Sequence, residues 1–264
     1  MQPLAFGLVP ASTTSNAFDE LARWMGENVG VTCTAKTAKT YKELAASVRD
    51  GSSDVAWLPP VVYAWLAEAV TPIGSLVRDR QATYAAALVV RDDSPLKELS
   101  SLEGAKVRAG WVDPWSAAGY VVPLIELSRK GVDPAAAFAK QTFHGSHDEA
   151  LRALARGDCD VVATYCRKRG EELEGGWSEV SDLRARVLAT FGEIPPDVIA
   201  TRRNLAVRDY ERARDALRRT FADPKGRELA RALFGGGELT ESVEPGHETL
   251  RIAYEGAVAK GLFD

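Results

Sequence analysis

Apolar residues in this chain occur in short runs that alternate with longer stretches of helical spacing. Runs of strand length lie at residues 4–10, 31–38, 54–60, 83–91 and 159–166. Between them, apolar residues recur three or four positions apart, as Phe18, Leu21 and Met25 do within residues 16–30. Buried strands that alternate with amphipathic helices are typical of an α/β protein. The pattern therefore predicts an α/β fold with mostly parallel sheets.

Capping residues, prolines and glycines indicate where some of these elements begin or end. Ser15 or Asn16 is placed to cap the helix that follows the first strand. Pro59 and Pro60 end the strand before them, because neither can donate a hydrogen bond to a sheet. Residues 234–241, FGGGELTE, are expected to form a flexible connection between C-terminal helices.

Two similar segments indicate where the chain divides. ALVVRDDSPL and VIATRRNL are each a β-branched run stopped by charged or turn residues. In a two-lobed protein such runs cross between lobes, so hinges are expected near residues 90 and 200. The first lobe would be residues 1–90 plus 201–264 and the second residues 91–200. A single sheet that contains both runs as ordinary strands is the alternative.

Length and charge limit the functions that the chain can have. Its 264 residues, 45% of them hydrophobic, can bury the core of one large or two intermediate domains. A formal net charge of -4 argues against a nucleic-acid partner, which would require clustered Lys and Arg. No apolar run reaches the roughly 18 to 20 residues that span a bilayer, so a soluble product is expected. Residues 1–12 do not predict an export signal.

Metal, cofactor and catalytic motifs are not predicted. Cys33, Cys159 and Cys166 form no CxxC pair and are expected to be packed thiols. His144 and His147 are three residues apart, but no further ligand completes a zinc set at helical spacing. The sequence has no GxSxG around Ser116, no Walker lysine and no GxGxxG after the first strand.

Residues 113–123, DPWSAAGYVVP, join a predicted strand to a predicted helix. Pro114 does not continue the strand, Ser116 is a strong N-cap residue, and Gly119 allows close approach to the backbone. A helix that begins here presents N–H groups beside a hydroxyl, and together they can hold an oxyanion. The alternative is that Ser116 caps its own helix and binds nothing, as at most capped helices.

A second predicted helix start follows at residues 145–148, Gly-Ser-His-Asp. His147 can donate to an anion there or serve as a proton switch. Alternatively, Ser146 or Asp148 is the cap and His147 is a solvated residue of the first turn. Aromatic residues also lie at predicted strand and helix ends, where α/β folds bind ligands. They are Tyr41, Trp57, Tyr84, Trp111 and Trp115.

Five segments together resemble the substrate-binding proteins of phosphate/phosphonate ABC transporters, which have the type II periplasmic-binding-protein fold. In chain order they are GLVPA, TYKELAASVRDGSSDVAWLPPVVYA, DPWSAAGYVVP, GVDPAAAFAKQTFHGSHDEALRALARGDCDVVAT and IPPDVIATR. The resemblance implies two lobes joined by two hinge crossovers, with a small phosphonate-like or phosphate-like anion held in the cleft between them. It also implies a non-catalytic, extracytoplasmic monomer that delivers its ligand to the membrane component of an ABC transporter.

The resemblance further implies a set of ligand contacts. The phosphono group would lie at the helix start that contains Ser116, with His147, Tyr41 and Tyr84 as further donors. Tryptophans, among them Trp111, would shape the pocket. The implied contact residues are Tyr41, Trp57, Tyr84, Trp115, Ser116, Ala117, Ala118, Gly119 and His147.

Departures from the family pattern leave the identity of the ligand open. Ala117 and Ala118 stand where relatives have hydroxyl residues, so two donors are missing while backbone N–H groups remain. Pro59 replaces a glycine and stiffens the loop after Trp57. Relatives recognise an amino end with acidic groups. Tyr165 stands where such a group is expected, and Asp197 is the candidate that remains.

Two other classes of function stay open at this point. An intracellular, cytoplasmic enzyme on the same fold fits the lost hydroxyls and the lack of an export signal. His147 with Asp148 or Glu193 would then form an acid–base pair. A ligand sensor for a signalling partner is the third alternative.

Overall fold

The computed structural model describes residues 2–9, 14–78, 81, 83–241, 243 and 246–263, without the side chains of residues 14 and 15. Two residues of the GLVPA segment, Pro10 and Ala11, lie outside this description. Helix α1 begins at Thr14. Ser15 and Asn16 therefore lie inside its first turn, and the expectation that one of them is the cap was wrong because the helix starts earlier than its apolar spacing indicates.

Internal contacts divide the chain into two compact units. Unit 1 comprises Met1–Ala82 and Pro195–His247, and unit 2 comprises Thr83–Ile194 and Glu248–Asp264. The chain passes between the units three times rather than at two hinges. The first two passages precede the expected residues 90 and 200, and the third places the C-terminal segment in unit 2 instead of the first lobe.

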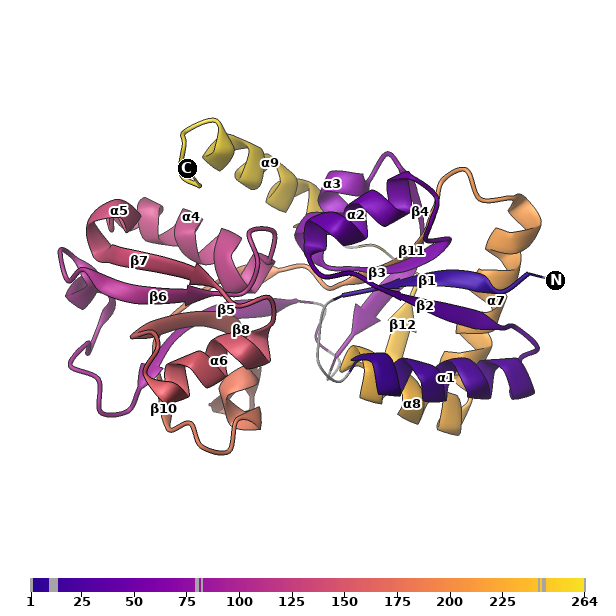
Figure 1. The fold of residues 1–264 in the computed structure, drawn as a ribbon, viewed down its shortest axis with the longest axis horizontal. Coiled ribbons are helices and arrows are strands. Elements are labelled where there is room, and N and C mark those ends of the chain that lie inside the picture. Colours follow the sequence, from indigo (N-terminus) through magenta and orange to yellow (C-terminus); the bar gives the residue numbers. More distant parts are fainter. Residues whose placement is uncertain are drawn as a thin grey trace. The chain divides into compact units, whose positions relative to one another are not determined.

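Unit 1 is built on a six-stranded sheet with strand order β12-β4-β11-β3-β1-β2 (Figure 1). The strands are β1 (Leu4–Leu8), β2 (Cys33–Thr37), β3 (Val55–Leu58), β4 (Val70–Val77), β11 (Val198–Arg202) and β12 (Glu238–Thr240). The helices are α1 (Thr14–Asn28), α2 (Tyr41–Arg49), α3 (Pro60–Leu66), α7 (Val207–Ala222) and α8 (Pro224–Phe234). Strand β3 ends directly before Pro59, as expected, and Pro60 occupies the first position of α3, where its missing N–H costs nothing.

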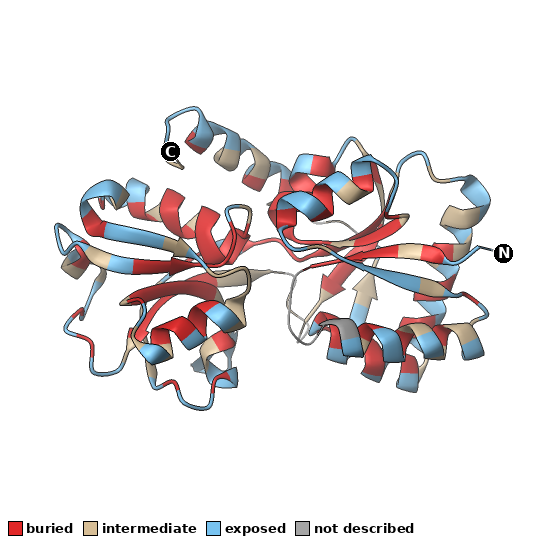
Figure 2. Ribbon diagram, viewed as in Figure 1, coloured by how far each residue is buried: buried red, intermediate tan, exposed pale blue. Residues whose placement is uncertain are grey.

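The apolar core of unit 1 joins the sheet to α1, α7 and α8. Phe6 of β1 packs on Phe18 of α1 with ring centroids 5.5 Å apart. Trp57 of β3 meets Phe234 at the end of α8 edge to face, with ring centroids 5.2 Å apart. Figure 2 shows the buried residues along the strands and on the inner helix faces of each unit.

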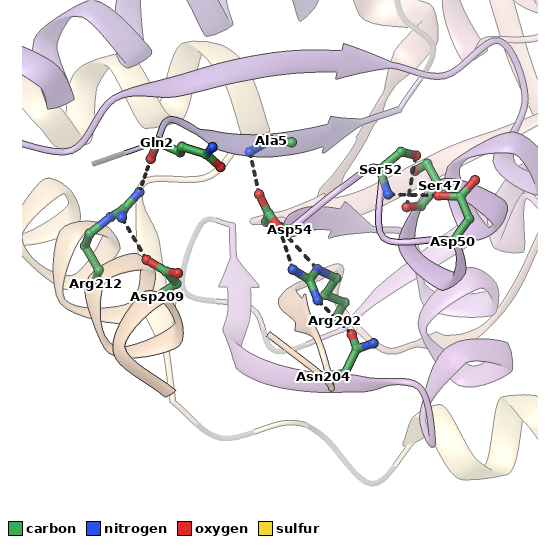
Figure 3. Close-up of polar contacts among 10 residues, drawn as sticks. All are labelled: Gln2, Ala5, Ser47, Asp50, Ser52, Asp54, Arg202, Asn204, Asp209 and Arg212. Carbon is green, nitrogen blue, oxygen red and sulfur yellow. Dashed lines mark hydrogen bonds and ion pairs between the residues drawn. The ribbon is translucent and has the colours of Figure 1, made fainter. Parts of the chain in front are cut away.

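A polar cluster also holds unit 1 together (Figure 3). Oδ2 of Asp54 accepts the backbone N–H of Ala5 at 3.0 Å, and Oδ1 of Asp54 accepts from Nε of Arg202 at 3.1 Å. Asp54 therefore ties the start of β3 to β1 and to the end of β11. Arg212 of α7 donates to the backbone oxygen of Gln2 at 2.8 Å and pairs with Asp209. These charged side chains stabilise unit 1, because each is hydrogen-bonded to a backbone group or to another side chain of the same unit.

Unit 2 is built on a second sheet with strand order β10-β5-β8-β6-β7, and β9 pairs with β8. The strands are β5 (Tyr84–Arg91), β6 (Val107–Trp111), β7 (Phe138–Phe143), β8 (Val161–Arg169), β9 (Glu172–Gly175) and β10 (Ala185–Ile194). The α-helices are α4 (Val122–Arg129), α5 (Pro134–Ala137) and α6 (His147–Arg156). Shorter turns are η1 (Leu99–Leu102), η2 (Ala117–Val121) and η3 (Gly176–Glu179), of which η2 is a π-helical turn that leads into α4.

Both sheets are mixed, so the expectation of mostly parallel sheets was wrong. Among the described residues, two of the five strand pairings in each sheet are parallel, β1 with β2 and β3, and β6 with β7 and β8. The antiparallel pairings bring in β4, β11 and β12 in unit 1 and β5, β9 and β10 in unit 2. For example, β8 turns directly into β9 and pairs with it antiparallel. Parallel neighbours need a crossover connection, which such short turns cannot provide.

Two strands of unit 1, β4 and β12, were not predicted from the sequence. Strand β12 lies within residues 234–241, which the glycines marked as a flexible connection. It pairs antiparallel with β4, with Leu239 opposite Leu76. A Cβ on Gly74 of β4 would overlap the backbone oxygen of Thr240. Gly74 lowers the strand propensity of β4, and its lack of a side chain is also what allows β12 to pair closely with β4.

Helix α9 (Gly246–Val258) begins in unit 1 and continues in unit 2. Nε2 of His247 hydrogen-bonds the backbone oxygen of Pro196 at 2.8 Å in unit 1. In unit 2, Tyr254 stacks on Phe263 with ring centroids 5.4 Å apart, and Phe263 also packs against Tyr120. These aromatic contacts place the end of the chain in unit 2. No described helix is both long enough and apolar enough to cross a membrane.

Candidate anion-binding site

Two neighbouring parallel strands of unit 2 lead to helices on opposite faces of the sheet. Strands β6 and β7 are paired up to their last residues, Trp111 opposite Phe143. The chain runs from β6 through α4 to β7, and then through α6 back to β8 on the other side of β6. Because such crossovers are right-handed, α4 and α6 cover opposite faces, as Figure 1 shows. Open α/β sheets bind ligands at the carboxyl ends of strands arranged in this way.

Backbone hydrogen bonds connect the two loops that leave this edge. The N–H of His144 donates to the oxygen of Trp111 at 2.9 Å, and the N–H of Gly145 donates to the oxygen of Val112 at 2.8 Å. The two predicted helix starts are therefore held side by side, although they are far apart in sequence.

The first helix start is built around Asp113 and Ser116. Oδ1 of Asp113 accepts the N–H of Trp115 at 2.8 Å, and its backbone oxygen accepts the N–H of Ser116 at 2.9 Å. Asp113 and Ser116 are both buried. Oγ of Ser116 accepts the N–H of Gly119 at 3.1 Å, so Ser116 is the N-cap, as the sequence predicted. A hydroxyl that accepts a bond keeps its own hydrogen, which it can donate to an anion.

The backbone after Ser116 winds as a π-helical turn. The N–H of Val121 donates to the oxygen of Ser116 at 3.0 Å, five residues earlier, and the N–H of Val122 donates to the oxygen of Ala117. The first N–H groups of any helix lack an acceptor within it, and π winding extends this set by one. Ala117, Ala118 and Gly119 are buried and lie in this turn. The N–H of Gly119 is bonded to Oγ of Ser116, so the backbone N–H groups of Ala117 and Ala118 are the ones that can replace the donors their side chains lack.

The second helix start contains His147, the first residue of α6. Oγ of Ser146 accepts the N–H of Glu149 at 3.2 Å, which makes Ser146 the cap. Nδ1 of His147 lies 3.0 Å from Oγ1 of Thr164 in β8, and its ring meets Tyr165 edge to face at 5.1 Å between centroids. His147 is therefore not a solvated side chain of the first turn. Two side chains of β8 fix its ring.

Arg167 is a charged residue at this edge that the sequence did not indicate. Its guanidinium carbon lies 5.6 Å from the ring centroids of both Tyr84 and Tyr165. Tyr84 is the first residue of β5, as predicted, and the antiparallel register of β5 with β8 places Arg167 opposite it. Tyr165 donates its hydroxyl to Glu179 at 2.8 Å. Strand pairing and aromatic contacts, which no local pattern reveals, assemble this group.

Two of the expected contact residues, Tyr41 and Trp57, belong to unit 1. Tyr41 is buried at the start of α2, where Thr40 is the N-cap. Nε1 of Trp57 donates to Oδ2 of Asp197 at 2.9 Å. The same Asp197 oxygen pairs with Arg78 at 2.5 Å, and both side chains are 11% exposed. Asp197 is therefore neutralised within unit 1, and its candidacy as an acidic group for a ligand amine was wrong because its charge is already matched.

The tryptophans of unit 2 have different surroundings. Trp111 is fully buried, and its Nε1 donates to Oε1 of Gln141 at 2.8 Å. It packs edge to face on Tyr120 and Phe138, so it belongs to the core and the expectation that it shapes a pocket was wrong. Trp115 is partly exposed and hydrogen-bonds the side chain of Tyr254.

The buried thiols and the grouping of possible metal ligands bear on metal binding and on nucleophilic chemistry. Among the described residues, no group of three or more His, Cys, Asp or Glu side chains could hold a metal ion. Burial raises the pKa of the Cys159 thiol to about 12 and that of Cys166 to about 11. Thiols with such pKa values are protonated and poorly reactive at neutral pH.

A family model and a known transport protein both match the sequence of this chain. A family model described as the periplasmic substrate-binding protein of phosphonate ABC transporters matches residues 6–244. The phosphate-import protein PhnD of Mycolicibacterium smegmatis is 26% identical over 176 residues, which are 61% of this chain and 54% of that protein. This chain thus spans about half the length of that relative.

Solved structures of related proteins have the same fold. A binding protein component of an ABC phosphonate transporter from Pseudomonas aeruginosa is 20% identical, with a TM-score of 0.79 over 99% of this chain and 95% of that one. PhnD1 of Prochlorococcus marinus, solved in complex with methylphosphonate, is 14% identical, with a TM-score of 0.78 over 97% of this chain and 98% of that one. The predicted type II periplasmic-binding-protein fold is confirmed.

Proposed function

Because this chain belongs to the family of periplasmic substrate-binding proteins of phosphonate ABC transporters, we propose that it captures a small phosphonate-like or phosphate-like anion for such a transporter. The proposed site is the edge of unit 2 where η2 and α6 begin. We also propose that the protein acts outside the cytoplasm as a monomer, binds its ligand without changing it, and hands it to the transporter's membrane component.

One observation carries this proposal. The loops after β6 and β7 are hydrogen-bonded to each other through Gly145 and Val112, so two helix starts meet at one edge. Each helix start is positive, because its dipole and unshared N–H groups point outward. The first also carries the buried hydroxyl of Ser116, and the second carries His147, whose ring Thr164 fixes. Such an edge suits an oxyanion.

The composition of the site bears on which oxyanion binds. Ser116 would supply the hydroxyl, and Ala117 and Ala118 would supply backbone N–H groups in place of the hydroxyls expected in relatives, while the N–H of Gly119 is bonded to Oγ of Ser116. Backbone N–H groups can only donate, so a ligand oxygen that bears a proton finds no acceptor among them. We therefore propose that a fully ionised phosphono or phosphate group is preferred over its monoprotonated form, because every donor then meets an acceptor.

Other expected contact residues keep their proposed roles in part. Tyr84 lies within the aromatic group around Arg167 at the same edge, and Trp115 lies in the loop that ends at Ser116. Trp57 can supply apolar surface only, since its N–H is used by Asp197. Closure of the two units around the ligand, which would recruit Tyr41 and Trp57, stays a prediction. A fall in the radius of gyration on addition of phosphate would test it.

Isothermal titration calorimetry with inorganic phosphate, methylphosphonate, sulfate and acetate tests the proposed function. We expect binding of phosphate or methylphosphonate, and a roughly ten- to hundredfold loss of affinity in Ser116→Ala, because a hydrogen bond to a charged group is lost. His147→Ala should also weaken binding.

A cap elsewhere in the chain provides the control. Asp223 caps α8 in unit 1 through the N–H groups of Lys225 and Gly226. Asp223→Ala should lower the free energy of unfolding by about 0.5 to 2 kcal/mol and leave the affinity unchanged. Equal affinities of wild type and Ser116→Ala, or no binding of phosphate and methylphosphonate, would contradict the proposal.

A further inference from the structure

The C-terminal segment of unit 2, residues 248–263, contacts the first helix start of the proposed anion site from outside. Trp115, in the loop before the cap residue, hydrogen-bonds the side chain of Tyr254. Tyr120, within η2 itself, packs against Phe263 with ring centroids 5.5 Å apart. One contact therefore precedes the cap residue in sequence and the other follows it, so the same segment holds both sides of the turn.

A turn at the end of α9 directs Phe263 to this contact. The N–H of Leu262 donates to the oxygen of Ala257 at 3.1 Å, and the N–H of Gly261 donates to the oxygen five atoms of backbone earlier, that of Val258, at 2.9 Å. Gly261 has a φ of 67°, in the left-handed region. These two bonds around a left-handed glycine are the Schellman motif, which commonly ends a helix. The chain after α9 therefore has a defined path, on the same side of the unit 2 sheet as α4 (Figure 1).

Aromatic rings join this segment to the core of unit 2. Phe263 stacks on Tyr254 with ring centroids 5.4 Å apart. Tyr120 packs edge to face on Phe143 at 4.9 Å and on the buried Trp111 at 5.5 Å, in addition to its contact with Phe263. Aromatic pairs of this kind stabilise a contact beyond the apolar area that they bury. Tyr120 thus contacts three rings, and the C-terminal segment supplies one of them.

The π-helical turn η2 depends on such contacts for its conformation. π-Helical winding is rare and occurs mostly as single turns. A backbone conformation that is uncommon by itself persists where the surrounding structure holds it. The N–H groups of Ala117 and Ala118, which would serve the anion, lie in this turn. A change in the winding of η2 would redirect both donors.

We propose that Tyr254 and Phe263 are positioning residues of the anion site, which hold η2 in the winding that presents its backbone N–H groups to the ligand. This inference rests on the proposed function. Neither side chain contacts the ligand, because each acts through its aromatic partner in or beside η2. The C-terminal segment then determines the affinity for the oxyanion that phosphate and phosphonates share, and it does not select among their substituents.

Calorimetry with inorganic phosphate and methylphosphonate measures the effect on binding. Phe263→Ala removes the ring that packs on Tyr120, and we expect it to weaken binding of both probes alike, by about three- to tenfold. Tyr254→Phe removes only the hydroxyl that Trp115 bonds, and it should weaken both by about two- to fivefold. Phe263→Tyr keeps the ring and should bind both probes as wild type does.

A spectroscopic measurement shows whether the turn itself responds. In proton–nitrogen correlation spectra of the protein without ligand, Phe263→Ala should shift or broaden the amide resonances of Ala117, Ala118 and Gly119. Phe263→Tyr should keep these resonances near their wild-type positions. A role of Phe263 in the stability of unit 2 alone would leave them unchanged.

Tyr210→Ala is the matched control. Tyr210 is a partly buried aromatic residue of α7 in unit 1, where it packs against the apolar core and its ring lies under Arg214. Its loss should lower the free energy of unfolding, since apolar contacts are removed. The affinities for both probes and the three amide resonances of η2 should stay at their wild-type values. Thermal unfolding of each variant measures its stability.

Each outcome decides between the two proposals. If wild type binds phosphate and Phe263→Ala binds it as tightly, the positioning role is refuted and the proposed function stands. Equal weakening in Tyr210→Ala and Phe263→Ala would also refute that role, because lost stability would then account for the change. Should Phe263→Ala not fold, wild-type affinity and wild-type amide resonances in Tyr254→Phe would refute it. If wild type binds neither phosphate nor methylphosphonate, the proposed function fails and the inference fails with it.

Discussion

Gly119 lies so close to Val112 that a methyl group on its Cα would overlap the valine side chain. Such a Cβ would lie 2.5 Å from Cβ of Val112 and 2.7 Å from Oγ of Ser116. The oxygen of Gly119 also accepts the N–H of Val112 at 3.2 Å. The start of η2 is therefore pressed onto the loop after β6, and only glycine permits this contact.

Substitution of Gly119 by alanine should thus disrupt the proposed site. We expect Gly119→Ala to lower the free energy of unfolding by about 1 to 3 kcal/mol, because the overlap forces the helix start away from Val112. Phosphate affinity should fall with it, since Oγ of Ser116 loses its position. Chemical denaturation and calorimetry measure both effects, and Val112→Ala combined with Gly119→Ala should recover part of the loss.

Gly256 in α9 is the matched control, because beyond its neighbouring residues and the backbone of its own helix no atom lies within 4 Å of where its Cβ would be. Gly256→Ala should raise stability by about 0.5 to 1 kcal/mol, since alanine favours a helix over glycine. If Gly119→Ala also left the free energy of unfolding unchanged or raised it, the close contact with Val112 would not contribute to stability.

The ion pair of Arg78 with Asp197 should contribute strongly to the stability of unit 1. Arg78 also donates to the oxygen of Phe234 at 2.9 Å, and Asp197 accepts from Trp57. Removal of one partner leaves the other charge buried, so Arg78→Met is expected to cost up to about 3 to 5 kcal/mol. In a double-mutant cycle, Asp197→Asn combined with Arg78→Met should cost much less than the sum of the single variants.

Arg156 and Asp158 form the comparison pair, with side chains 56% and 55% exposed. Arg156→Met should change the free energy of unfolding by no more than about 1 kcal/mol. Additive costs in the double-mutant cycle for Arg78 and Asp197 would show that the two charges do not depend on each other.

His144 should make the stability of unit 2 depend on pH. Its Nε2 is buried without a hydrogen-bond partner among the described residues. Burial, aided by Arg156, lowers the pKa of His144 below its ordinary value of 6.5, while Asp158 and Glu149 oppose the shift. As the pH falls below about 6.5, the unfolded chain takes up a proton before the folded one, so the free energy of unfolding falls. It levels off once the pH is below the pKa in the fold.

Denaturant titrations from about pH 7.5 to about pH 5 test this dependence. His144→Phe removes the titrating group and should make the loss of stability on acidification smaller than in wild type. A wild-type protein that gains stability on acidification in this range, with the gain lost in His144→Phe, would mean that His144 has a raised pKa.

The thiols should be slow to react in the native protein. Burial raises the pKa of Cys33 to about 11, as it raises those of Cys159 and Cys166 to about 11 or 12. The thiolate is the reactive species, so alkylation at about pH 8 should be far slower than for an unfolded chain. Mass spectrometry after brief treatment with iodoacetamide should find little label in native protein and label on all three cysteines in guanidinium chloride. Rapid labelling of native Cys159 would contradict its burial.

Local pattern was sufficient for much of the secondary structure and for the two helix starts. Ser116 caps the turn that it was predicted to cap, and α2 and β5 begin at Tyr41 and Tyr84 as expected. These features depend on capping chemistry and apolar spacing, which act between residues a few positions apart. The order of five short segments was sufficient for the family and its fold, which the comparisons confirmed.

Tertiary structure alone decided features that depend on residues far apart in sequence. Strand direction in both sheets, the pairing of β12 with β4, and the neutralisation of Asp197 by Arg78 all join distant segments. The placement of Arg167 between two tyrosines likewise follows from the register of β5 and β8. A sequence specifies such contacts only through the whole fold, because no periodicity or motif within one segment records which distant residue will face it.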